Sequence, residues 1–123
     1  MKNKLNAAVI GLGVGAKHAE ILNSDNKVNL VALCDLDKKK INFYKKKFKK
    51  CKFTTQAEEI FKDPDIDIVS ITSYDNFHSK HILQAIKYKK HFFVEKPFCL
   101  NISELNNRPL TILVSLYNRP ILK

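Results

Sequence analysis

The residues with the clearest chemical potential are the three glycines of the chain, Gly11, Gly13 and Gly15, which follow the apolar run 7–10. A helical pattern begins directly after them. At such a strand-to-helix junction, the first glycine permits a tight turn and the second lets the backbone approach a pyrophosphate. The helix N-terminus then offers free N–H groups to the anion. The spacing therefore predicts a dinucleotide-phosphate site formed by Gly11, Gly13, Val14 and Gly15.

The position of the third glycine is irregular. In the pattern G-x-G-x-x-G the third position falls on Ala16, and Gly15 stands one place early. Alanine is accepted there because it still permits close packing of the helix on the strand. Glycines also end strands and start turns where no ligand binds, so the turn by itself leaves a purely structural interpretation open.

An acidic residue after the second apolar run supports a cofactor site. Asp35 ends this run, where a carboxylate can accept hydrogen bonds from the adenosine ribose hydroxyls. Its charge would repel a 2′-phosphate and so favours NAD, whereas Lys38 and Lys39 could pair with one and leave NADP as an alternative. Asp35 could otherwise serve as a helix cap or turn residue. Val9 stands where methyltransferases usually carry an acidic residue, which argues against a methyl donor.

Alternating strand and helix patterns position these residues. The expected strands are Leu5–Ile10, Val28–Cys34, Lys52–Thr54, 66–72 and His91–Val94, and the expected helices are 16–23, a segment capped by Asp37, 56–62 and 78–89. Ile41, Tyr44 and Phe48 fall on one face of the capped helix, with lysines around the rest. Strands separated by helices predict parallel βαβ units. The fold class is therefore α/β, a Rossmann-type doubly wound parallel sheet in three layers.

Composition narrows the class of protein. The 123 residues, 45% hydrophobic and 28% charged, fit one globular domain. No apolar run approaches the roughly 18 residues of a membrane span, so we expect no membrane partner. Lys2 and Lys4 precede an apolar stretch, but the glycines and charges that follow are unlike a signal peptide. Cys34, Cys51 and Cys99 are odd in number and widely spaced, which argues against disulfides and zinc and favours a cytoplasmic location.

The net charge of +10 comes mostly from lysine and suggests a nucleic-acid partner as one hypothesis. Few arginines accompany these lysines, and no aromatic residues are interleaved with them. Aromatic side chains usually stack on the bases of a bound nucleic acid, so a common feature of such sites is missing here. We therefore expect a solvated helix face and regard nucleic acid as an unlikely ligand.

Several short motifs occur together in an order typical of one family. They are 9–15 (Val-Ile-Gly-Leu-Gly-Val-Gly), a nearby His18, 32–35 (Ala-Leu-Cys-Asp), 70–73 (Ser-Ile-Thr-Ser) followed by His78, and 93–97 (Phe-Val-Glu-Lys-Pro). Together they resemble the N-terminal domain of the glucose–fructose oxidoreductase / inositol dehydrogenase / rhizopine catabolism (Gfo/Idh/MocA) family over roughly residues 5 to 106. The sequence Glu95-Lys96-Pro97 is the most distinctive part of this resemblance.

The resemblance implies an NAD(P)-binding domain of a sugar or cyclitol oxidoreductase, with a small polyol or sugar as the substrate of intact relatives. The family's lysine that matches Lys96 reaches the nicotinamide and the substrate, and here it would act as the catalytic residue. A lysine there can hydrogen-bond a sugar hydroxyl or stabilise charge on its oxygen. Glu95 and Pro97 would flank it at the cofactor. Ser73 and His78 match the segment that lines the cofactor, although the family often has proline in place of Tyr74.

The resemblance also implies what the chain lacks. The family's second domain supplies the usual acid/base histidine and most substrate contacts, and nothing after Leu105 resembles it. We assign that role to neither His81 nor His91, so we expect a truncated chain without appreciable turnover of its own. Its exposed sheet face should favour self-association. The alternative is a stand-alone nucleotide-binding or regulatory module without catalysis.

We therefore predict a dinucleotide-binding domain over residues 1–106 and an atypical tail over 107–123. In the tail, two Asn-Arg-Pro sequences bracket the strand-like run 111–117. Two interpretations of this run stay open, an additional edge strand and the out-of-frame end of an interrupted gene.

Overall fold

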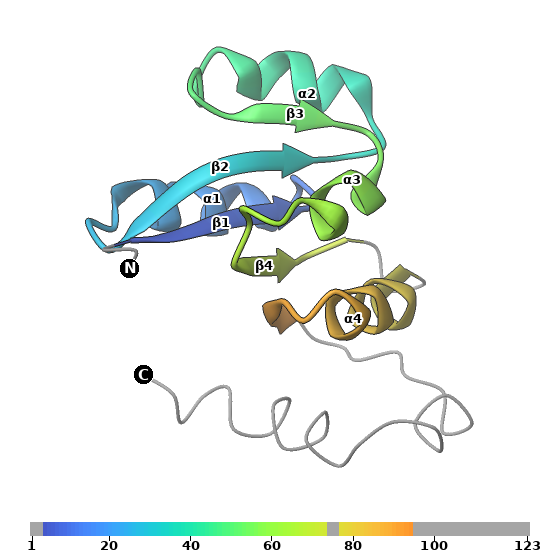
Figure 1. Cartoon of the computed structure of the whole chain (residues 1–123). Helices are drawn as coiled ribbons and strands as arrows, with labels where there is room; N and C mark the ends of the chain where they lie inside the picture. Colours follow the sequence, from blue (N-terminus) through green and yellow to red (C-terminus); the bar gives the residue numbers. More distant parts are fainter. Residues whose placement is uncertain (1–3, 74–76, 95–123) are drawn as a thin grey trace.

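Strands and helices alternate along the chain, as predicted. A computed structural model describes residues 4–73 and 77–94 (Figure 1). In chain order the elements are β1 (Leu5–Ile10), α1 (Gly15–Ser24), β2 (Val28–Cys34), α2 (Lys38–Lys45), β3 (Lys52–Thr54), α3 (Ala57–Lys62), β4 (Ile68–Ile71), α4 (His78–Lys87) and β5 (His91–Val94). Among the described residues, none of the helices has the length and apolar character that crossing a membrane would need.

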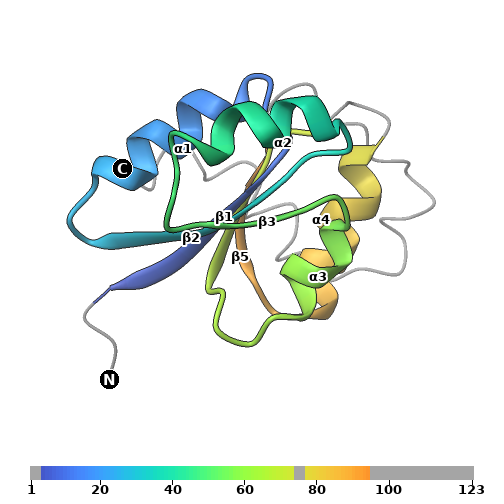
Figure 2. The ribbon, with the colours of Figure 1, turned by 90° about the horizontal axis from the view of Figure 1, so that it is seen from above.

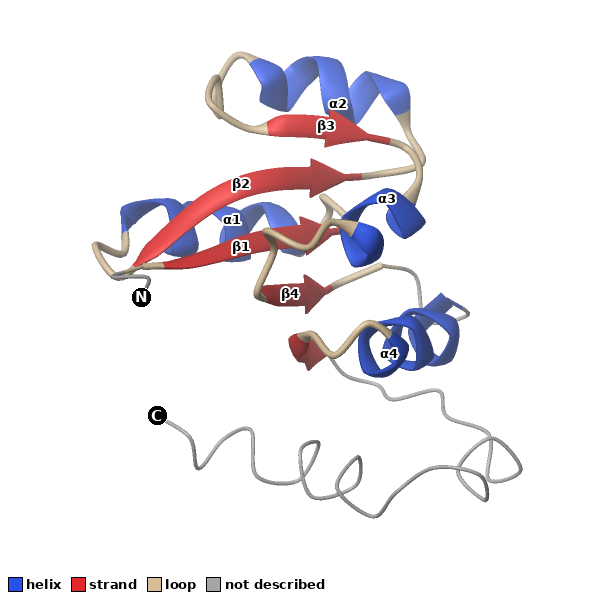
Figure 3. Cartoon of the chain, viewed as in Figure 1, coloured by secondary structure: helices blue, strands red, loops and turns tan. Residues whose placement is uncertain are grey.

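The five strands form one sheet in the order β3-β2-β1-β4-β5, and every pair of neighbours is parallel. β1 lies between β2 and β4, so strand order reverses beside it. Such a switch point is where open α/β sheets bind ligands, at the carboxyl ends of the strands. α1 and α2 cover one face of the sheet, and α3 and α4 cover the other (Figures 2 and 3). The predicted doubly wound, three-layer α/β fold is confirmed.

Each face of the sheet has its own hydrophobic core, because successive strand residues point to opposite faces. Val9 and Leu33 are fully buried on the side of α1 and α2. Ala8 and Ile10 point to the opposite side, where they pack in the core that includes Phe61 of α3. A sheet covered on both faces keeps its strand ends fixed, and these ends carry the site described below.

The ends of several elements differ from the sequence predictions for tertiary reasons. β4 spans four residues, fewer than the expected 66–72. α2 ends at Lys45, so Phe48 follows the helix; it is nevertheless buried, in a turn in which its N–H donates to the Tyr44 carbonyl oxygen. α4 ends at Lys87, because Lys89 adopts a left-handed φ of 58° that closes the helix. The tail 107–123, with the run 111–117, lies outside the described residues.

Candidate cofactor site

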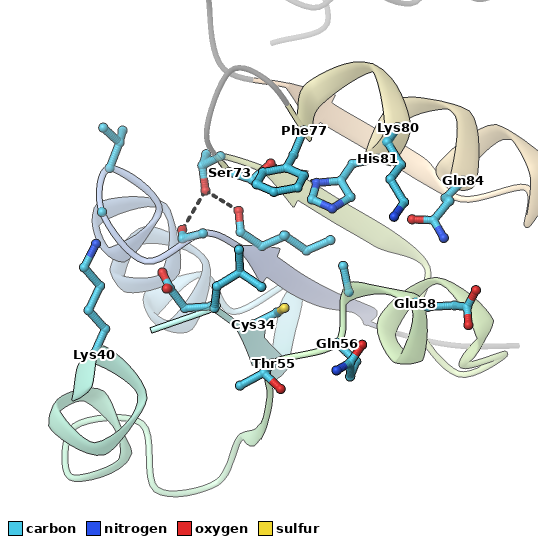
Figure 4. Close-up of a pocket in the computed structure, with 18 residues that line it drawn as sticks. Cys34, Lys40, Thr55, Gln56, Glu58, Ser73, Phe77, Lys80, His81 and Gln84 are labelled. Carbon is cyan, nitrogen blue, oxygen red and sulfur yellow. Dashed lines mark hydrogen bonds between the residues drawn. The ribbon is translucent and has the colours of Figure 1, made fainter. Parts of the chain in front are cut away.

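A cleft of about 850 Å³ opens at the carboxyl ends of β1, β2 and β4 (Figure 4). The glycine turn and the end of β2 form one part of its wall, and the start of α3 and the first turns of α4 form the rest. Its lining residues are Ile10, Gly11, Gly13, Val14, Cys34, Asp35, Leu36, Lys40, Thr55, Gln56, Ala57, Glu58, Thr72, Ser73, Phe77, Lys80, His81 and Gln84. Gly11, Gly13, Val14, Asp35 and Ser73, which the sequence had singled out, are thus brought together.

Gly11 makes the tight turn that ends β1. Its φ is +94°, a conformation that side chains disfavour, and its N–H donates to the Cys34 carbonyl oxygen at 2.7 Å. A Cβ here would lie 2.6 Å from the carbonyl carbon of Thr72 and 2.7 Å from the Cα of Ser73. Because both obstacles are backbone, only glycine fits at this position.

Gly13 and Gly15 serve different purposes. A Cβ on Gly15, the first residue of α1, would collide with the Thr72 hydroxyl and lie 2.9 Å from Cγ1 of Val9. Gly15 therefore also allows close packing of the helix on the strand, next to the buried Ala16. A Cβ on Gly13 would meet only the Lys40 ammonium nitrogen, at 4.0 Å. The open space beside Gly13 is what a pyrophosphate requires of the second glycine.

Thr72 fixes the turn from the side of β4. Its hydroxyl lies 2.8 Å from the carbonyl oxygens of both Ile10 and Gly11, and its N–H donates to the Ile10 oxygen at 2.8 Å. Sequence reasoning gave this residue no role of its own. Its signal was its place at the end of an apolar run, but that signal becomes specific only once β4 is known to pair with β1.

Asp35 is buried, with 8% of its surface exposed, and it holds the turn from the side of β2. Its Oδ2 accepts from the Leu12 N–H and its Oδ1 from the Asp37 N–H, both at 2.7 Å. Asp37 is the residue that caps α2, accepting from the Lys39 N–H. A carboxylate oxygen has more than one acceptor site, so Asp35 retains capacity for the hydroxyls of a ribose.

Cys34 precedes Asp35 and contributes a neutral thiol to the cleft. Burial, assisted by the negative charges of Asp35 and Glu59, raises the pKa of the Cys34 thiol to about 12. Only 2% of the surface of Cys34 is exposed. Within 4–73 and 77–94, no three His, Cys, Asp or Glu side chains converge as the ligands of a metal ion would.

On the α4 side, the cleft contains a pair that sequence reasoning missed. The Ser73 hydroxyl and His81 Nδ1 are 2.8 Å apart, and His81 is buried. The Phe77 ring stacks on His81 at 5.9 Å between centroids and 18° between planes (Figure 4). His81 shares the inward helical face of Ala85, and this spacing was the available signal. His78 is the first residue of α4, and its side chain is outside the description.

Other motif residues lie elsewhere. His18 is on the α1 face of the sheet, where its Nδ1 is 2.8 Å from the Ser70 hydroxyl and its ring contacts Phe93. These residues border a separate groove of about 220 Å³ and do not line the cleft. Residues 95–97, the Glu-Lys-Pro sequence, directly follow β5 and lie outside the described residues, as does Tyr74.

A glycine turn at the switch point of a doubly wound parallel sheet, with a buried carboxylate at the end of β2, defines a dinucleotide-binding Rossmann domain. The comparison with known families makes this more specific. Residues 5–108 match the Gfo/Idh/MocA family, described as an oxidoreductase family with an NAD-binding Rossmann fold. The chain belongs to this family and comprises its NAD-binding domain, which confirms the resemblance seen in the motifs.

Individual relatives agree with this assignment. Myo-inositol 2-dehydrogenase of Thermotoga maritima is 35% identical over 99 residues, which are 80% of this chain and 30% of that protein. The NAD⁺-dependent scyllo-inositol 2-dehydrogenase of Bacillus subtilis is 31% identical over 106 residues, 85% and 31% of the two chains. The structure of Lactobacillus casei scyllo-inositol dehydrogenase with NAD(H) and scyllo-inositol has a TM-score of 0.78 at 25% identity, and the match covers 91% and 34%. The chain thus spans about a third of these relatives.

Proposed function

We propose that the cleft binds NAD(H), with the pyrophosphate at the turn formed by Gly11, Gly13, Val14 and Gly15. The observation that carries this proposal is the space beside Gly13, in which a Cβ would meet no described atom nearer than 4.0 Å beyond the residues next to it in the chain. The other two glycines of the turn are packed against Thr72, so only Gly13 leaves room for a ligand. α1 begins at Gly15, directly after this space, and no acidic residue in its first turn would repel an anion from its N-terminus.

The adenosine ribose would bind at Asp35, whose carboxylate is already oriented by two backbone N–H groups. A negative charge there disfavours a 2′-phosphate, so NAD should bind more tightly than NADP, with NADP as the weaker ligand. Ser73 and His78 would line the cofactor from the side of β4 and α4. The free thiols of Cys34 and Cys51 suit a reducing, cytoplasmic location.

The reaction class follows from the family. A bound nicotinamide cofactor supplies hydride exchange with an alcohol carbon. Lys96, with Glu95 and Pro97, follows β5 at the edge of the sheet where ligands bind, and would donate a hydrogen bond to the reacting hydroxyl. The names of the inositol dehydrogenases among the relatives favour a cyclitol or related polyol as the substrate class. The second candidate is a nucleotide-binding module without catalysis, which would bind NAD equally well.

Calorimetric titration with NAD and NADP tests the cofactor assignment. Asp35→Asn should weaken NAD binding by about 1–3 kcal/mol, the usual cost of a lost buried hydrogen-bond partner. It should also narrow the difference between NAD and NADP. Asp37→Asn is the matched control, because it removes the same charge two residues away while asparagine still caps the helix. Equal affinities of the wild-type chain for NAD and NADP, or equal effects of the two substitutions, would contradict the proposal.

A further inference from the structure

One lysine of α2 is set apart from its neighbours by its position. Lys38 and Lys39, which the sequence suggested as partners of a phosphate, are exposed and absent from the cleft lining. Lys40 is half-buried and lines the cleft, and Figure 4 shows its side chain extending toward the loop that precedes α1. Only the third lysine of the run therefore reaches the site.

The ammonium group of Lys40 borders the space that Gly13 leaves open. Apart from atoms of Gly13 and its two chain neighbours, its nitrogen is the one described heavy atom within 4 Å of the point that a Cβ on Gly13 would occupy. The N–H groups of Gly13 and Val14, in the same turn, have no acceptor among the described residues. Three hydrogen-bond donors thus belong to this turn and its border, and one of them carries a full positive charge.

Lys40 is also free to bind an anion. The ion pairs between described residues are Lys47 with Glu20 and Lys62 with Glu58, so Lys40 pairs with no carboxylate in this part of the chain. The nearby carboxylate of Asp35 accepts from two backbone N–H groups instead. A partly buried ammonium beside unpaired N–H groups favours a phosphate, since a charge-assisted contact there is less screened than at an open surface.

We propose that Lys40 contacts a phosphate of the bound dinucleotide and thereby sets much of its affinity. The geometry beside Gly13 favours the 5′-pyrophosphate as this group. The inference rests on the proposed NAD site and adds to it a residue from α2, outside the glycine turn.

The test compares Lys40→Met with Lys39→Met by calorimetry, using ADP, adenosine, NAD and NADP. Both variants lose one charge from the same helix turn, but only Lys40 borders the cleft. We expect Lys40→Met to weaken ADP and NAD binding about fivefold to tenfold, with no change for adenosine and little change in Lys39→Met. Raising the salt concentration should weaken NAD binding less in Lys40→Met than in the wild-type chain.

The outcomes separate the inference from the proposed site. Equal losses for NAD and NADP would support contact with the pyrophosphate, whereas a loss for NADP alone would overturn that contact and assign Lys40 to the 2′-phosphate instead. Wild-type binding of ADP and NAD with no difference between the two variants would overturn the role of Lys40 and leave the site intact. No binding of ADP or NAD by the wild-type chain would overturn both, and far-UV circular dichroism would verify that every variant is folded.

Discussion

Replacing Gly13 with alanine should raise the stability of the chain and lower its affinity for NAD. The new Cβ would meet only the Lys40 ammonium nitrogen, at 4.0 Å, and the φ of Gly13 is not positive, so the folded chain accommodates alanine without strain. Alanine also restricts the unfolded chain, which should add about 0.4–1 kcal/mol to the free energy of unfolding. The same methyl group would occupy the space proposed for the pyrophosphate. Such overpacking typically costs about 1–3 kcal/mol, or roughly fivefold to 150-fold in affinity.

Substitutions at the other two glycines provide matched controls, because they should lower the stability of the chain where Gly13→Ala should raise it. Gly11→Ala would combine a φ of +94° with backbone contacts at 2.6–2.7 Å, and Gly15→Ala would place a Cβ 2.9 Å from Val9 and against the Thr72 hydroxyl. Strain and overpacking together should destabilise Gly11→Ala by about 2–5 kcal/mol. Chemically identical substitutions within five residues are thus expected to change stability in opposite directions.

Urea unfolding followed by circular dichroism measures the stabilities, and calorimetric titration with NAD measures the affinities. The reasoning is refuted if Gly13→Ala loses stability as Gly11→Ala does, because the space beside Gly13 would then be filled. It is also refuted if Gly13→Ala binds NAD like the wild-type chain. Gly13→Val extends the series, since its larger side chain should abolish binding.

Three further predictions concern the surroundings of the site. Thr72→Val should lower the free energy of unfolding by about 1–3 kcal/mol, because the Gly11 carbonyl oxygen loses its hydroxyl donor while the Ile10 oxygen keeps the Thr72 N–H, and Thr72→Ser should retain most of this free energy in urea unfolding. The raised pKa of Cys34 implies stability that is complete below pH 9.0 and lost as the pH rises toward 12. The pKa of Cys51 is also raised, to about 11, so both thiols contribute to this loss. Between pH 8 and pH 10 the wild-type chain should therefore lose about 1 kcal/mol more stability than Cys34→Ala in urea unfolding. Finally, Ile21 and Phe93 are 68% and 38% exposed beside one apolar groove. Ile21→Lys should therefore reduce any concentration-dependent association seen by sedimentation.

The order of the elements was predictable from sequence because each buried strand is a short apolar run bounded by turn residues. β1 and β2 have their predicted limits for this reason. The ends of α2 and α4 were less predictable, because they depend on tertiary contacts. Phe48 has helical spacing from Tyr44 but packs after the helix has ended, and the left-handed Lys89 replaces the glycine that usually marks such a helix end.

The residues of the candidate site likewise include some that could be identified from the sequence and some that could not. Gly11 and Asp35 could be found because their residue types are required by a local task, a positive φ in one case and a buried acceptor in the other. Thr72, Lys40 and His81 are ordinary residue types whose roles depend on their neighbours in space. Thr72 matters because β4 pairs with β1. His81 matters because one turn of α4 places it opposite Ser73. Neither the pairing of β4 with β1 nor the contact of His81 with Ser73 can be inferred from residue spacing within a single helix or strand.

The contacts of the glycine turn indicate which residues would position it for binding a pyrophosphate. The turn is held from two strands, by Asp35 at the Leu12 N–H and by Thr72 at the Gly11 carbonyl oxygen. Both contacts are made between residues of the chain itself and need no atom of a ligand, so they pre-organise the turn and reduce the binding energy that ordering it would cost. Asp35 therefore has two tasks, positioning the turn and receiving the ribose. Its replacement should weaken even ligands that lack a ribose, such as inorganic pyrophosphate, whereas a residue that only recognised ribose would leave pyrophosphate binding unchanged.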